Sequence, residues 1–305
     1  MEATNNPGAG RVRTALVANG SMFATTVLRT LIEASSIDLK LLILSRESNI
    51  THGAGSGNPP IPPVRVTGSG TMVDLARDNC IGVAAYNGGS ALTTASFEEP
   101  FDFILVACCA EWIAPEIAAL AKHACLNLHP SLLSRYRGPE PIFWQLKAGE
   151  TNTGISLHHI EVRMDSGPVV AMHRVAYPSG ASADELDQLL ARAGASLFIQ
   201  AIARWRDSNF ELPVVQQDES MASQQSYADD QDFLVPVTWS AQRAFNFIRG
   251  VRGGPFTITN GTHRLLVDRA MRLESDGEPG CPYYMDGNQA VIGFKDGTLH
   301  LRCCK

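Results

Sequence analysis

Near its start the chain alternates between short apolar runs and an amphipathic helical pattern. Residues 12–18 and 39–44 are apolar runs with the length of buried strands, and residues 22–34 between them repeat apolar side chains at helical spacing. A strand, a helix and a second strand in this order form the crossover that joins parallel strands of one sheet. Because the alternation continues as far as a long amphipathic segment at 183–205, the sequence predicts an α/β fold, a parallel sheet covered by helices.

The pattern changes after Val237. A helical segment at 241–249 is followed by several short apolar runs that are separated by turns containing glycine, which is typical of a small β-barrel. The predicted organisation is a disordered tail at residues 1–11, an α/β domain at 12–210, a polar linker at 211–236 and a β-barrel domain at 237–305.

The composition limits the class of protein. In 305 residues of which 45% are hydrophobic, the chain has enough apolar side chains for a sizeable core, but it lacks an apolar run of about 18 residues that would predict a membrane span. Its polar start does not resemble a secretory signal. Seven cysteines without a C-x-x-C pair predict free thiols in a reducing cytoplasm and argue against a zinc site; the pair Cys108-Cys109 is expected to lie in an apolar strand, in the core. The absence of G-x-G-x-x-G makes a dinucleotide site a weak alternative.

Two polar residues in the middle of the chain, Asn127 and His129, are two positions apart. On a strand such residues point to the same side, and the apolar run that ends at Pro130 predicts a strand here. An amide N–H and an imidazolium N–H that converge on one oxygen stabilise a developing oxyanion. Asp165, in a predicted turn before an apolar run, supplies a carboxylate that favours the protonated imidazole and fixes its tautomer. An Asn-x-His pair is also common in ordinary turns, so the indication of a catalytic site comes from the ordered set of three groups.

The segment around these residues resembles the folate-dependent formyltransferases. Residues 127–138 read Asn-Leu-His-Pro-Ser-Leu-Leu-Ser-Arg-Tyr-Arg-Gly, which is similar to the N-x-H-x-S-L-L-P-x-x-R-G signature of that family, and residues 141–158 resemble the family's next helix and strand. The resemblance covers nearly the whole chain. It implies a Rossmann-like parallel-sheet formyltransferase domain followed by a small OB-like β-barrel, and it places the catalytic Asn, His and Asp on Asn127, His129 and Asp165.

The same resemblance implies which residues bind folate. One family loop gives an apolar wall to the pterin ring, and Trp112 and Ile113 match it, although Trp112 equally suits a hydrophobic core. Met164, next to the catalytic aspartate, is also expected at the folate. The family's Ser-Leu-Leu-Pro segment borders the folate; here a serine replaces the proline, which frees an N–H and loosens the local backbone. This segment consists of Ser131, Leu132, Leu133 and Ser134.

Two further polar residues near the signature have open roles. His158 matches a family position near the active-site loop and either orients Asp165 or is a strand histidine with a structural partner. Arg137 either holds its loop or meets an anionic part of the substrate.

The resemblance implies transfer of a formyl group from 10-formyltetrahydrofolate to a primary amine, with no metal required. A tRNA acceptor calls for basic surface, whereas the chain carries a net charge of −6 and residues 211–305 hold nine Lys and Arg against twelve Asp and Glu. We therefore expect a cytoplasmic enzyme that acts on a small-molecule amine, such as an amino sugar nucleotide or an amino-acid-like metabolite, without a nucleic-acid or membrane partner. A basic cluster around Arg243, Arg249 and Arg252 keeps methionyl-tRNA formylation open. Hydrolysis of 10-formyltetrahydrofolate and a non-catalytic binding role are further alternatives, and an oligomer is compatible with the sequence.

Overall fold

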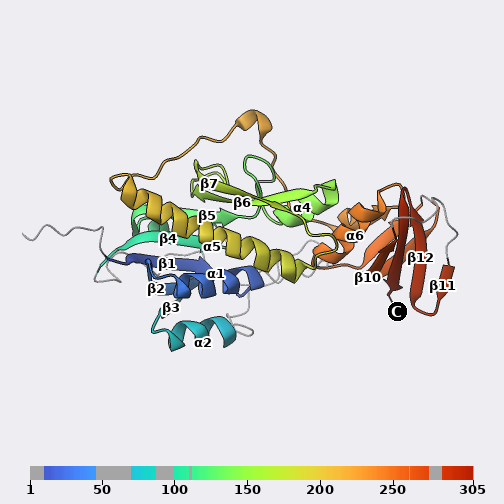
Figure 1. Ribbon diagram of the computed structural model, residues 1–305, viewed down its shortest axis with the longest axis horizontal. Helices are drawn as coiled ribbons and strands as arrows, with labels where there is room; N and C mark the ends of the chain where they lie inside the picture. Colours follow the sequence, from blue (N-terminus) through green and yellow to red (C-terminus); the bar gives the residue numbers. More distant parts are fainter. Residues whose placement is uncertain are drawn as a thin grey trace, which may run out of the picture.

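The computed structural model describes residues 10–45, 70–86, 99–109, 112–260, 262–274 and 284–304. Within these residues the chain forms two β-sheets with helices packed on them, and Figure 1 shows the second sheet at one end of the molecule, beyond α6. No helix among the described residues is long and apolar enough to span a lipid bilayer.

The first sheet has seven strands in the order β3-β2-β1-β4-β5-β6-β7. The strands β3, β2, β1, β4 and β5 pair in parallel, whereas β6 and β7 are antiparallel to their neighbours. The strands are β1 Val12–Ala18, β2 Ile37–Leu44, β3 Gly82–Ala85, β4 Phe101–Ala107, β5 Ala121–His129, β6 Asn152–His159 and β7 Val169–Ala176.

The predicted α/β fold with a parallel sheet is confirmed, and the sheet continues after β5 with two antiparallel strands. The helix between β5 and β6, α4 Pro141–Ala148, places Phe143 and Leu146 in the core of the second sheet. Since α4 does not cross a face of the first sheet, the chain re-enters beside β5 from the same end and runs back antiparallel.

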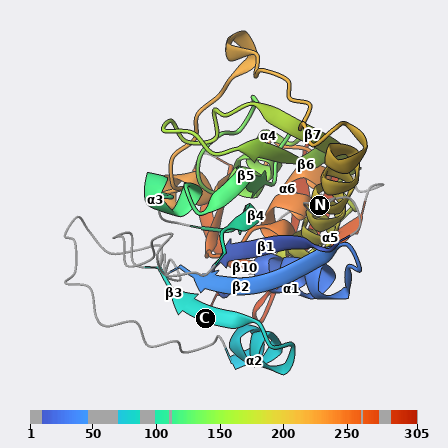
Figure 2. The ribbon, with the colours of Figure 1, turned by 90° about the vertical axis from the view of Figure 1, so that its left-hand side faces the viewer.

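Helices cover both faces of the first sheet. Figure 2 shows α1 and α5 on one face and α3 on the other. Ser21 starts α1 by accepting the Ala24 N–H, and Ser182 with Glu185 forms a capping box at the start of α5. The helices of this unit are α1 Met22–Glu33, α2 Gly70–Asp78, α3 Pro115–Ala118 and α5 Ala183–Asp207.

The second sheet has six strands in the order β11-β12-β13-β10-β9-β8. The helix α6 Ala241–Gly250 packs on it through Phe247, which contacts Phe256 and Phe143 edge-on, so the two units share this aromatic cluster. Its strands pair antiparallel except for β8, which runs parallel to β9, and they agree with the expected small β-barrel domain. They are β8 Leu234–Pro236, β9 Phe256–Thr259, β10 Arg264–Glu274, β11 Tyr284–Asp286, β12 Gln289–Phe294 and β13 Gly297–Cys303.

The connector between α5 and β8 lies against the first sheet. Val215 bonds with Val169 of β7 in both directions at 2.8 Å, and two 3-10 helices follow, Glu219–Met221 and Asp230–Phe233. Of the predicted N-terminal tail, residues 1–9 lie outside the described residues, and Arg11 Nε donates to Ile37 O at 2.7 Å.

Candidate active site

A cavity of about 560 Å³ opens at the carboxyl ends of β1, β4 and β5. This edge is where open α/β sheets place ligands, and the volume is in the range of small-molecule sites, roughly 300–1,000 Å³. Asn127, His129 and Asp165, predicted to act together, all line this cavity.

The register of β5 against β6 builds one side of the site. Asn127 and His129 lie two apart on β5, and β6 pairs antiparallel so that His158 is directly opposite Asn127. Asn127 Nδ2 donates to His158 Nε2 at 3.1 Å, while His158 Nδ1 contacts His159 O at 2.8 Å. Because a neutral imidazole has one N–H, these contacts are satisfied when His158 carries its proton on Nδ1 and accepts at Nε2.

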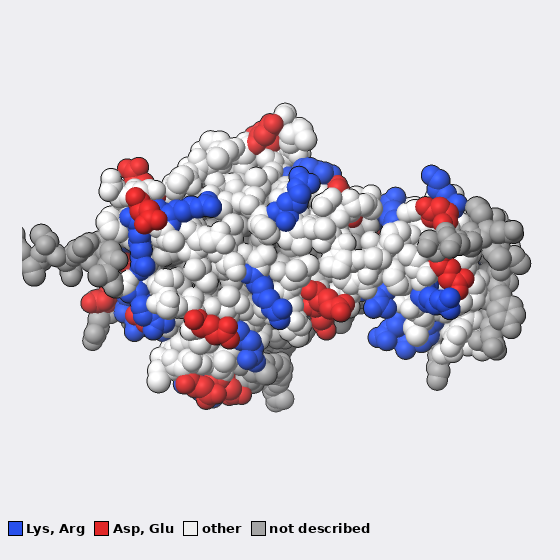
Figure 3. All heavy atoms as spheres, viewed as in Figure 1, with Lys and Arg blue, Asp and Glu red and all other residues white. Residues whose placement is uncertain are grey.

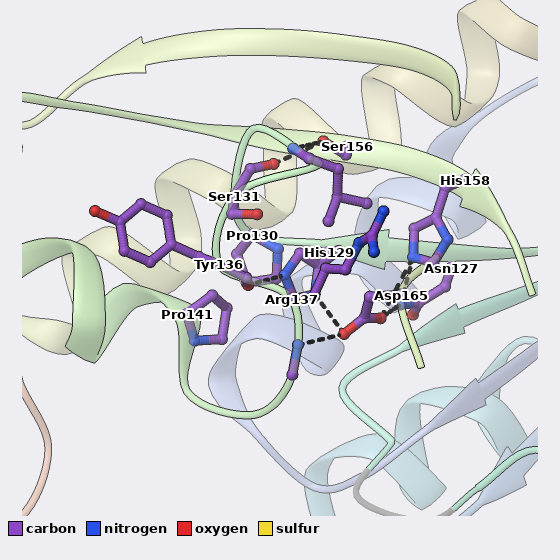
Figure 4. Close-up of polar contacts among 12 residues, drawn as sticks. Asn127, His129, Pro130, Ser131, Tyr136, Arg137, Pro141, Ser156, His158 and Asp165 are labelled. Carbon is purple, nitrogen blue, oxygen red and sulfur yellow. Dashed lines mark hydrogen bonds and ion pairs between the residues drawn. The ribbon is translucent and has the colours of Figure 1, made fainter. Parts of the chain in front are cut away.

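Asp165 reaches between the two histidines from a tight turn, as Figure 4 shows. Its backbone has a φ of 52°, and its Oδ2 accepts the Gly138 N–H at 2.8 Å. The Oδ2 atom also lies 3.5 Å from His129 Nδ1, and Oδ1 lies 3.5 Å from His158 Nε2. Asn127 Nδ2 donates to Oδ1 at 3.4 Å. One carboxylate therefore links both histidines, the amide and the loop at Gly138.

Burial and neighbouring groups shift the pKa values of His129 and Asp165. Burial lowers the pKa of His129 and outweighs the opposing effects of the Asp165 carboxylate and the Tyr136 carbonyl. Burial would raise the pKa of Asp165, but His129, His158 and the Gly138 N–H outweigh it and hold that pKa well below its usual range.

Asp165 is ionised in the free site, since the Gly138 N–H donates to it whatever the charge of His129. In the free site His129 is then neutral, whereas the sequence led us to expect a protonated imidazole. His129 Nε2 donates to Tyr136 O at 2.7 Å, and Nδ1 faces Asp165. Both ring nitrogens thus face acceptors, so the site is arranged to hold a second proton when negative charge develops in the cavity.

Three of the residues expected at the folate line the cavity. Trp112 and Met164 are each 51% exposed, and Ile113 is buried. Trp112 therefore presents its indole to the cavity, and the alternative of a core tryptophan does not hold for it.

The Ser-Leu-Leu-Ser segment, residues 131–134, was also expected to border the folate. These four residues are not among those that line the cavity. Ser131 is fully buried and donates its hydroxyl proton to Arg135 O at 2.8 Å, and Leu132 packs on Gly154, where an added Cβ would lie 2.3 Å from its Cδ2. Leu133 N donates to Ser156 Oγ at 3.1 Å, and the Leu133–Ser134 peptide bond is cis. In this structure the segment supports the loop behind His129.

Arg137 also points away from the cavity, which favours the loop-holding role over contact with a substrate anion. Its side chain is 4% exposed, and its guanidinium donates to Gln217 Oε1 at 2.8 and 3.0 Å and to Glu219 Oε1 at 2.7 Å. The amide of Gln217 in turn donates to Asp165 O at 2.7 Å and to Gly167 O at 2.8 Å. The connector thereby ties the turn of Asp165 to the loop of Arg137.

The sequence analysis missed several lining residues. Arg252 and Gly253, which follow α6, and Tyr227 of the connector close the cavity from the side of the second unit, and Glu140 lies at the start of α4. Their sequence neighbourhoods are ordinary loops, so no local signal marks them. Cys108, expected in a strand, lies just after β4 at a φ of 57° and also lines the cavity; burial raises the pKa of its thiol to about 12.

Within the described ranges, no group of three or more His, Cys, Asp or Glu side chains is placed to hold a metal ion.

Comparison with known proteins agrees with this geometry. Residues 85–202 match the formyl transferase family model. A methionyl-tRNA formyltransferase from Thermotoga neapolitana is 28% identical over 225 residues, which cover 73% of this chain and 71% of that protein. The next curated relatives are aligned over 64% of their length, just under two thirds.

Solved structures of sugar-modifying enzymes share the fold. The sugar 3N-formyl transferase WlaRD, solved with dTDP and 5-N-formyl-THF, superimposes with a TM-score of 0.60 at 17% identity and covers 96% of this chain and 98% of its own. The N-formyltransferase from Helicobacter canadensis, in complex with folinic acid and dTDP-3-aminofucose, gives 0.60 at 14% identity, with 95% and 98% covered. The chain is therefore similar in sequence to formyltransferases and shares the fold of sugar N-formyltransferases.

Proposed function

We propose that this protein transfers a formyl group from 10-formyltetrahydrofolate to the primary amine of a small-molecule acceptor. The observation that carries the proposal is the convergence of Asn127, His129 and Asp165 on one cavity of small-molecule size. Trp112 and Met164 supply exposed apolar surface in the same cavity, which suits a flat heteroaromatic ring.

The residues divide the chemistry between them. The acceptor nitrogen attacks the formyl carbon, a C–N bond forms, and the carbonyl electron pair moves to oxygen. Asn127 donates a hydrogen bond to that oxygen and the charge of protonated His129 stabilises it; one oxyanion donor typically lowers a barrier by about 2.7–4 kcal/mol. Breakage of the bond to the folate nitrogen then restores the carbonyl, and the proton lost by the acceptor amine passes to the departing nitrogen.

Asp165 supports these reaction steps mainly through its negative charge. A carboxyl whose pKa is held so low is a weak base, so we assign it the stabilisation of His129 when that imidazole gains a proton. His158 accepts from the amide of Asn127 and so holds that amide in place. The amine proton leaves through water next to Asp165 and passes to the departing folate nitrogen.

The choice of a small acceptor rests on charge. Figure 3 shows acidic and basic side chains intermixed over the visible face, with a group of basic side chains near the second sheet. Several arginines of that unit are neutralised by carboxylates, which weakens a surface for tRNA phosphates. These pairs are Arg252 with Asp184 and Asp187, Arg272 with Glu274, and Arg302 with Asp268.

A second candidate, formylation of methionyl-tRNA, is favoured by the names of the curated relatives. The two acceptors require different surfaces, so they are distinguished by activity on each.

The test is release of tetrahydrofolate from 10-formyltetrahydrofolate, followed with a panel of amino sugar nucleotides, amino acids and charged initiator tRNA. We expect release that depends on a small amine, and its loss in Asn127→Ala, His129→Ala and Asp165→Ala. His173→Ala, an exposed histidine on β7, is the matched control. Release without any amine would replace the proposal by hydrolysis, and faster turnover with tRNA would replace the acceptor.

A further inference from the structure

Tyr86, directly after β3, joins the cavity wall through its hydroxyl. Its Oη donates to Trp112 O at 2.8 Å and accepts the Ala114 N–H at 3.0 Å. The ring is 2% exposed and packs in the core under α3, and its own N–H donates to Leu44 O at 2.7 Å. One side chain therefore links the edge of the sheet to a segment 26 residues away.

The segment that Tyr86 holds has no regular structure of its own. Residues 112–114 lie between the described end of the β4 loop and α3, and Ile113 packs in the same core as Tyr86. In the part of the chain that the structure describes, both hydrogen bonds that tie this segment to the sheet end on the Tyr86 hydroxyl. Trp112 lines the cavity and is half exposed. Because its side chain is only partly packed against protein, its position depends on how firmly its backbone is held.

We propose that Tyr86 is a positioning residue for the folate: its hydroxyl fixes the backbone of Trp112 and Ala114 so that the indole forms a rigid wall of the cavity. This rests on the proposed function, in which Trp112 contacts the folate ring. A preorganised wall improves affinity because less conformational freedom is lost on binding.

The discriminating variant is Tyr86→Phe, which keeps the buried ring and removes one donor and one acceptor. It leaves the buried Ala114 N–H without its partner, so residues 112–114 gain freedom. We expect the dissociation constant of tetrahydrofolate, measured by calorimetry, to rise about three- to tenfold, the ratio that corresponds to loss of a neutral hydrogen bond. In turnover the KM for 10-formyltetrahydrofolate rises equally, while kcat and the KM for the acceptor stay within twofold.

Tyr177→Phe is the matched control, because Tyr177 is part-buried against the second core and does not line the cavity; it should leave tetrahydrofolate binding unchanged. The coupling is read from a double-mutant cycle with Trp112→Ala, which removes the aromatic wall that Tyr86 is proposed to position. If Tyr86 acts through Trp112, Tyr86→Phe changes the affinity less than twofold in the Trp112→Ala background.

The outcomes separate the two proposals. Equal affinity of the wild type and Tyr86→Phe, or additive effects in the cycle, would overturn the role of Tyr86 and leave the transferase proposal standing. Failure of the wild-type protein to bind tetrahydrofolate would overturn both.

Discussion

Replacing Asp165 by asparagine tests the electrostatic core of the site. The side chain is 10% exposed and lies 3.5 Å from both His129 Nδ1 and His158 Nε2. Asparagine has nearly the same shape and can still accept the Gly138 N–H through its one carbonyl oxygen. The charge is lost, and an NH₂ group then faces an imidazole nitrogen or the Asn127 amide.

The magnitude follows from the distance. At 3.5 Å and an effective dielectric constant of about 20, a carboxylate and an imidazolium attract each other by about 5 kcal/mol. Since each 1.36 kcal/mol is a factor of ten in rate, complete loss corresponds to a reduction of about 3,000-fold. Because the amide dipole and nearby water recover part of this energy, we expect kcat to fall by roughly 10²- to 10³-fold.

The assay is amine-dependent release of tetrahydrofolate between pH 5 and 8, with the dissociation constant of tetrahydrofolate measured separately. In Asp165→Asn the remaining activity should increase relative to the wild type as the pH falls, because more of His129 is then protonated, and folate binding should change little. Asp218→Asn, an exposed capping residue in the connector, is the control. A kcat within tenfold of the wild type at every pH would refute the assigned role of the carboxylate.

Other substitutions test the supports of the site. Gly167→Ala would place a Cβ 2.0 Å from His159 O, so the turn must shift, and we expect a large loss of kcat with retained circular dichroism; unchanged kcat would show that the turn adapts. Arg137→Met removes the buried bonds to Gln217 and should lower the free energy of unfolding in urea by about 1–3 kcal/mol; no loss would contradict the loop-holding role. Because burial lowers the pKa of His129, the unfolded state takes up that proton first, and unfolding free energy should fall as the pH drops below about 6.5. His129→Gln should flatten that decline between pH 7.5 and 5, and an equally steep decline would assign it to other groups.

Local periodicity was sufficient for most elements of the first sheet. The predicted strand at 12–18 is β1 to the residue, and the helix predicted at 22–34 ends at Glu33. These segments show their structure in sequence because each buries one face or both along its own length. The reversal of β6 could not be predicted in this way, because it depends on where α4 packs.

In the site, too, some features could be predicted from local sequence and others depend on the tertiary structure. The spacing of Asn127 and His129 predicts a shared side of one strand, and the structure has it. That His158 lies opposite Asn127 depends on the register of two strands, which no single segment encodes. The catalytic roles of the predicted triad stay predictions until the variants are measured.

The α/β class, the family signature and the three polar groups proposed to carry the chemistry could be read from the sequence, because periodicity and spacing are properties of neighbouring residues. The tertiary structure alone decided that Arg137 bonds to the connector, that the serine–leucine segment lies behind His129, and that Tyr86 holds Trp112. These contacts join residues from separate elements, and their geometry exists only once the sheet, the connector and the loops have packed together.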